Sequence, residues 1–230
     1  VSLVAETFGA MPPRQADNPE AYAKLKLVSP SDKIELTYET TDEPRSVAVR
    51  MWKSAGRADA AKMRIDNVVG AVLDDVLRKD VREAQGKVYS PFAYNNSSTW
   101  LENTGMMTAA TFVVPQYNSE LLATLEECGK KVARGITKDE FERAKIPLIK
   151  SVEANKRRNA YWIEAVLNLS QCKPVNIELA KTIDTGYAKI TLEETIARAK
   201  EIIASEAYTA SVMPVKIKKE LKKTKYEVGD

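Results

Sequence analysis

The chain contains no histidine among its 230 residues. Zinc sites draw heavily on imidazole ligands, and the two cysteines present, Cys128 and Cys172, cannot close a tetrahedral site by themselves. The zincin HxxEH pattern is absent, as is every Ser-His or Cys-His nucleophile system. The common kinds of self-contained hydrolase are therefore excluded, although chemistry that uses carboxylates alone is not.

Several other features are also scarce. Two cysteines are too few for a disulfide framework, and their places on apolar helical faces predict buried free thiols. No apolar run is long enough to span a bilayer. Lys and Arg number 35 against 32 for Asp and Glu, so the charge indicates neither a nucleic acid nor an anionic membrane. No Gly-rich phosphate loop supports an independent small-molecule-binding domain.

The N-terminal stretch VSLVAETFGAMPPR has neither an initiator Met nor a signal peptide. It predicts the end of a helix, residues 1–8, which stops at Gly9. Residues 12–32 are rich in Pro, Ser, Asp and Asn and predict an irregular surface crossing. We expect the chain to begin inside a domain, as a fragment or a processed piece of a longer protein.

Alternating apolar residues predict strands near residues 33–40 and 45–53, and the intervening TDEP favours a hairpin between them. Two more strands, near 87–97 and 104–114, are joined by a polar loop and are expected to be antiparallel neighbours. A short strand near 208–213 is closed by Pro214.

Helical spacing is clearest over residues 59–84, where one apolar stripe is expected to pack on the sheet. A second helix is predicted from Asn118 to Gly135, and a third, kinked by Pro147, follows it. Capping boxes at Thr137 and Thr191 open two helices. A further helical stripe is predicted from these apolar residues: Tyr161, Trp162, Ala165, Val166 and Leu169.

This order of elements predicts an α+β domain: a mostly antiparallel β-sheet with helices packed on one face. We expect it to cover residues 1–215. Residues 216–230 form a basic tail, which a solvated extension explains better than a nucleic-acid or acidic-lipid contact, because the tail has only Tyr226 for base stacking. Trp52, Trp100 and Trp162 are predicted to be core or interface residues rather than a ligand cage.

The stretch between the longest predicted helix and the next strand, VREAQGKVYSP, holds Arg82 and Tyr89. Gly86 suits the closure of the helix, which places a guanidinium before the turn and a phenol after it. Together they could serve a carbonyl oxygen that becomes negative during acyl transfer. Alternatively, Arg82 is a cation favoured at a helix C-terminus and Tyr89 an ordinary strand aromatic, and the spacing by itself favours this second interpretation.

LRKDVREAQGKVYSP resembles a segment of the pitrilysin/insulinase family of zinc metallopeptidases, in the last homologous domain of the bacterial "zinc protease" type. The resemblance extends from Val1 to about Val215. It implies a C-terminal domain that binds no zinc, with the mitochondrial processing peptidase/LuxS-like metallohydrolase fold, and with its first strand and part of its first helix missing.

The resemblance also implies a function. Arg82 and Tyr89 would reach across to a peptide substrate at the metal site of the other half of the protein. No cofactor is expected in this chain. Zinc is expected in a histidine-bearing peptidase domain, on the same polypeptide or a separate subunit, where it polarises the scissile carbonyl and activates water. The isolated chain would then be an inactive part of a zinc metalloendopeptidase.

The alternative is a catalytically inert scaffolding domain of the same fold. The intact Arg–Gly–Tyr segment favours the first interpretation, because a pure scaffold needs neither polar side chain. Likeness to secreted bacterial members indicates the periplasm or cell envelope, and a homodimer of the fragment stays open.

Overall fold

The structure is a computed structural model. It describes residues 1–12, 34–38, 44–82, 88–98, 101, 103–168, 170 and 174–215, with the side chains of residues 82, 88 and 89 left out. The chain divides into two compact units, Val1–Pro30 and Ser31–Asp230. The first holds α1 (Ser2–Thr7) and η1 (Phe8–Ala10), close to the predicted helix. The predicted crossing and basic tail lie almost wholly outside the described residues.

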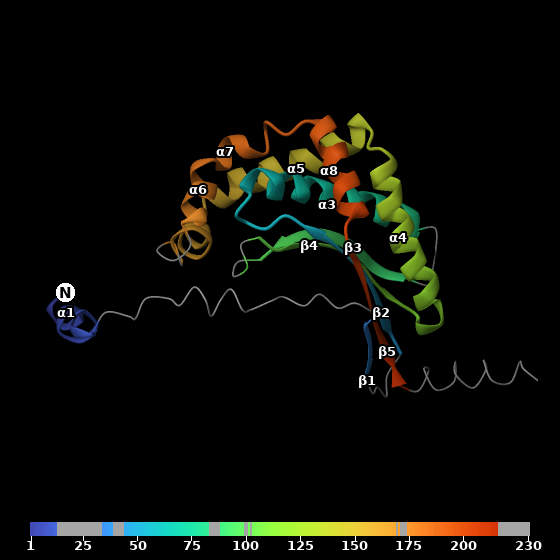
Figure 1. The fold of residues 1–230 in the computed structure, drawn as a ribbon, viewed down its shortest axis with the longest axis horizontal. Helices are drawn as coiled ribbons and strands as arrows, with labels where there is room; N and C mark the ends of the chain where they lie inside the picture. Colours follow the sequence, from blue (N-terminus) through green and yellow to red (C-terminus); the bar gives the residue numbers. More distant parts are fainter. Residues whose placement is uncertain are drawn as a thin grey trace, which may run out of the picture. The chain divides into compact units, whose positions relative to one another are not determined.

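The second unit contains a five-stranded sheet (Figure 1). Its strands are β1 (Ile34–Tyr38), β2 (Ser46–Ser54), β3 (Val88–Ser97), β4 (Gly105–Val113) and β5 (Ala207–Pro214). The strand order is β1-β5-β2-β4-β3, in which β1 and β5 are parallel and every other pair is antiparallel. The predicted α+β fold, the five strand positions and the pairing of β3 with β4 are confirmed.

The predicted hairpin between the first two strands is wrong. β5 lies between β1 and β2, so that Val212 pairs with Leu36 on one side and with Val47 on the other. Nearness in sequence favours a hairpin, but here β5, far away in the sequence, takes the place between the two strands. Long-range pairing of this kind has no local signal.

The helices of the second unit lie along one face of the sheet (Figure 1). They are α3 (Ala60–Arg82), η2 (Pro115–Tyr117), α4 (Asn118–Arg134), α5 (Lys138–Lys156), η3 (Tyr161–Leu167), α6 (Val175–Lys181), α7 (Ile183–Gly186) and α8 (Leu192–Ala204). The predicted stripe of α3 is buried, with Val68, Val72 and Leu73 at most 1% exposed. Both predicted capping boxes are present, Thr137 with Glu140 and Thr191 with Glu194.

The apolar stripe predicted from Tyr161 onward is wrong. This segment forms a π-helix, η3, in which only Val166 is buried, while Trp162 stays 37% exposed. A π-helix pairs residues five apart, so the spacing that aligns side chains on an α-helix does not hold here. Leu169 lies outside the described residues, as does Trp100, whereas Trp52 is in the core as predicted.

A buried ion pair joins α3 to α8. Asp66, with no exposed surface, accepts hydrogen bonds from Arg198 Nε at 2.6 Å and from Arg198 Nη2 at 3.0 Å. Asp66 Oδ2 also accepts from the Ala55 backbone N–H at 2.7 Å. These hydrogen bonds raise the pKa of the Arg198 guanidinium, against the opposing effect of burial. One carboxylate therefore fixes two helices and the loop that follows β2.

Candidate functional site

The two faces of the sheet differ in their cover. Along β4, Met107, Ala109 and Val113 point to the helices and are 0% exposed, whereas Phe112 on the other face is 42% exposed. No described helix of the second unit covers this other face, which we call the uncovered face (Figure 1). Register and alternation assign these residues to it: Ile34, Leu36, Tyr38, Val47, Val49, Met51, Lys53, Phe92, Tyr94, Asn96, Met106, Thr108, Ala110, Phe112, Tyr208, Ala210 and Val212.

The uncovered face is mainly apolar. Phe92 and Tyr94 stack on it with ring centroids 6.0 Å apart, and Tyr94 is 47% exposed. Large exposed apolar patches on proteins mark sites where another protein segment or a ligand binds. The sheet therefore offers a contact surface on the side away from its own helices.

The predicted pair, Arg82 and Tyr89, lies at one edge of this sheet. Arg82 is the last residue of α3, and Tyr89 is the second residue of β3, the edge strand. The backbone pairs position 89 with Phe112, on the uncovered face. Both side chains lie outside the described part of the structure, so the prediction that they share one concave surface stays a prediction.

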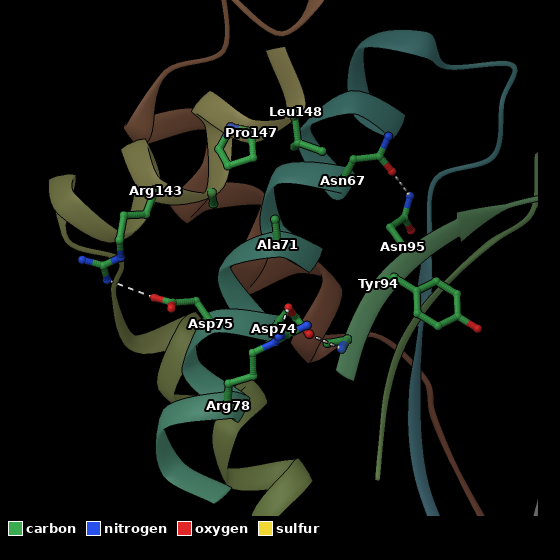
Figure 2. A pocket seen from close by; sticks show the side chains of 12 residues that line it. Asn67, Ala71, Asp74, Asp75, Arg78, Tyr94, Asn95, Arg143, Pro147 and Leu148 are labelled. Atoms are coloured by element: carbon green, nitrogen blue, oxygen red, sulfur yellow. Dashed lines mark hydrogen bonds and ion pairs between the residues drawn. The ribbon is translucent and has the colours of Figure 1, made fainter. Parts of the chain in front are cut away.

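Sequence reasoning missed a groove on the opposite, helical side of the unit (Figure 2). It has a volume of about 800 Å³ and runs between α3, α5 and β3. Its lining residues are Asn67, Ala71, Asp74, Asp75, Arg78, Ala93, Tyr94, Asn95, Arg143, Ala144, Pro147 and Leu148. The spacing of Asp74 and Arg78, four apart on a helix, is the one sequence signal that could have indicated part of it.

The carboxylates of the groove are bound to neighbouring groups. Asp74 accepts from Arg78 Nε at 2.8 Å and from the Ala93 backbone N–H at 2.9 Å, the second of which satisfies a group on the edge strand. Asp75 accepts from Lys79 at 2.8 Å and from Arg143 at 2.9 Å. Although burial acts in the opposite direction, these hydrogen bonds lower the pKa of the Asp75 carboxyl. Each carboxylate therefore accepts hydrogen bonds from two donors of the chain.

A zinc ion does not fit the part of the chain that the structure describes. No group of three or more His, Cys, Asp or Glu side chains comes together there. Cys128 is buried, as predicted, and burial together with nearby Asp80 raises the pKa of its thiol to about 12. Cys172 lies outside the described residues. Among the described helices, none is long and apolar enough to cross a membrane.

The family of the chain follows from comparison with known proteins. The family model described as the peptidase M16 inactive domain matches residues 1–148, and the chain belongs to this family. This confirms the predicted resemblance to the non-zinc-binding domain of these proteases. No curated protein sequence matches the chain.

Solved structures share the fold at low sequence identity. The periplasmic protease PqqL from Escherichia coli is 18% identical with a TM-score of 0.66, over 93% of this chain and 24% of that one. A peptidase M16 inactive domain from Pseudomonas fluorescens is 14% identical with a TM-score of 0.64, over 79% and 43%. A protease from Helicobacter pylori is 13% identical with a TM-score of 0.67, over 93% and 52%. The chain thus spans about a quarter to a half of these structures.

Proposed function

We propose that this domain is the non-zinc-binding part of an M16-type zinc metallopeptidase, and that its uncovered face helps to enclose and position a peptide substrate. The observation that carries the proposal is the apolar uncovered face, on which Phe112 and Tyr94 stay more than two-fifths exposed in a domain of this family. The structural relatives are two to four times as long as the part matched, so there is room for the histidine-bearing partner domain.

Arg82 and Tyr89 would act at the rim of this face. α3 lies on the covered side of the sheet and position 89 belongs to the uncovered side, but β3 is the edge strand. The proposal requires that the guanidinium and the phenol meet around that edge. A guanidinium and a phenol are both donors that suit a substrate carbonyl oxygen as it gains negative charge.

A second candidate function is an inert scaffold of the same fold. The observation in its favour is that the matching family model is described as an inactive domain. The two candidates differ in what they require of the uncovered face: a scaffold needs only its shape, whereas a substrate-facing domain needs the donors at its rim.

The same proposal includes the compartment and the partners. Because a structural relative is a periplasmic protease, we assign this protein to the periplasm or cell envelope. The partner would be a histidine-bearing peptidase domain, on the same polypeptide or a separate subunit, and the ligand a peptide.

We expect the isolated chain to bind no stoichiometric zinc and to cleave no peptide, because it has no histidine and its described acidic groups do not cluster. Metal analysis and a chelator-sensitive peptidase assay on the purified chain check this. Adding the histidine-bearing half should then produce cleavage that neither part shows alone. One tightly bound zinc per chain, or cleavage by the chain alone that survives rigorous purification, would contradict the proposal.

A further inference from the structure

β3 contains one residue too many for regular pairing with β4. Tyr89 pairs with Phe112 and Phe92 pairs with Ala110, so three steps along β3 match two steps along β4. Within this bulge Ser90 has φ of 48°, the only positive value at a non-glycine residue of the described chain. Such bulges are frequent beside active sites, where they re-aim a side chain.

The bulge decides which face position 89 occupies. Side chains alternate between the two faces at every residue, and directly paired residues of antiparallel strands share a face. If β3 had no bulge, regular pairing from Phe92 and Ala110 toward the start of β3 would place position 89 opposite Val113. Val113 is 0% exposed, on the side of the sheet that the helices cover. The extra residue places position 89 instead opposite Phe112, which is 42% exposed on the uncovered face.

We propose that Ser90 is a positioning residue, whose left-handed backbone holds the bulge that brings Tyr89 onto the uncovered face. Without the bulge, Tyr89 would lie on the opposite side of the sheet from Phe92 and Tyr94. Left-handed φ is uncommon for residues other than glycine and is retained mostly where function requires it. The role of Tyr89 in catalysis rests on the proposed function, but the face that it occupies does not.

Cysteine labelling of the full chain tests the face directly. Single replacements Tyr89→Cys, Tyr94→Cys and Ala93→Cys are treated with a maleimide, and mass spectrometry counts the labels added beyond those of the parent chain. Position 89 should react within a few-fold of position 94. Position 93, where Ala93 is 8% exposed, should react about tenfold or more slowly, because a buried thiol reacts only through local opening. Reaction at position 89 as slow as at position 93 would overturn the proposal.

Thermal stability tests the conformation of Ser90. In a left-handed bulge Ser90→Gly should raise or keep the Tm, while Ser90→Val should lower it, because a β-branched residue disfavours positive φ. A regular edge strand predicts the reverse order, since valine favours strands and glycine weakens them. That reverse order would overturn the proposal even if the labelling rates agreed with it.

Deletion of Ser90 is a third test of the register of β3. Removing Ser90 leaves two steps between Tyr89 and Phe92 on β3, which equals the two steps between their partners Phe112 and Ala110 on β4. The two strands can then pair regularly, and position 89 keeps its face without a bulge. In the deleted strand the backbone of Pro91 would have the same orientation as that of Ala93, whose N–H points away from β4 and donates to Asp74. Because proline has no N–H to donate, this orientation means that no hydrogen bond between β3 and β4 would be lost. Labelling at position 89 should survive the deletion, and its loss would count against the proposal.

If labelling and Tm agree but turnover of the assembled enzyme is unchanged in Ser90→Val, the proposed function of Tyr89 fails and the positioning does not.

Discussion

If Tyr89 has the proposed role, replacing it with Phe in the assembled peptidase should lower turnover by roughly 100- to 1,000-fold, the usual effect of removing one oxyanion donor. The change keeps the ring and removes only the hydroxyl. Substrate affinity should change less than turnover, because the donor meets its full charge only in the transition state. Steady-state kinetics on a defined peptide measure both quantities.

The matched control is Tyr161→Phe, on η3 and not on the uncovered face, where we expect near-normal turnover. Arg82→Lys should also be damaging, because an ammonium cannot reproduce the planar fork of donors of a guanidinium. The Tm of each variant should stay close to that of the parent. Near-normal turnover after both Tyr89→Phe and Arg82→Lys, or a loss explained wholly by unfolding, would favour the inert scaffold.

Asp66→Ala should lower the stability of the isolated chain by about 3–5 kcal/mol, because it removes the buried counter-charge of Arg198 and leaves the guanidinium only the exposed Glu201, 2.7 Å from Nη1. At about 2–4 °C per kcal/mol for a domain of this size, the Tm should fall by roughly 10 °C. Differential scanning calorimetry measures the change.

Glu127→Ala is the control for this effect, because Glu127 pairs with Arg134 at 2.7 Å but both side chains are more than half exposed. Such exposed pairs contribute about 1 kcal/mol at most. The double replacement Asp66→Leu with Arg198→Met should recover much of the loss, since it removes both buried charges. Equal Tm changes in Asp66→Ala and Glu127→Ala would contradict the role of this ion pair.

Periodicity was enough to predict most of the regular elements. The stripe of α3 and the alternation of β2 and β4 reflect burial on one face, and burial controls which residue types a position accepts. The capping boxes at Thr137 and Thr191 were predictable because the interaction is completed within four consecutive residues. Local physics of this kind can be inferred from one sequence.

Features that depend on distant parts of the chain were not predictable. The insertion of β5 beside β1, the groove of Figure 2 and the pair of Asp66 with Arg198 each join residues far apart in sequence. The π-helix was missed for another reason: its apolar residues have ordinary helical spacing, but the backbone does not wind with that period.

The candidate site was predictable only in part. A family motif, and not spacing, indicated Arg82 and Tyr89. The structure adds the register of Tyr89 and the left-handed Ser90 beside it. A bulge cannot be predicted from YSPF alone, because it is fixed by the partner strand, which pairs on both sides of the extra residue.

Photo-crosslinking tests most directly whether the uncovered face meets the substrate. A benzophenone amino acid is placed at Phe112 on the uncovered face, 42% exposed, or at Ile146 on α5, 45% exposed, so that the two sites match in accessibility. In the assembled peptidase, illuminated with a bound peptide substrate, the proposed function predicts crosslinks to the peptide from position 112 and none from position 146. Crosslinks from position 146 alone, or from both positions equally, would contradict it.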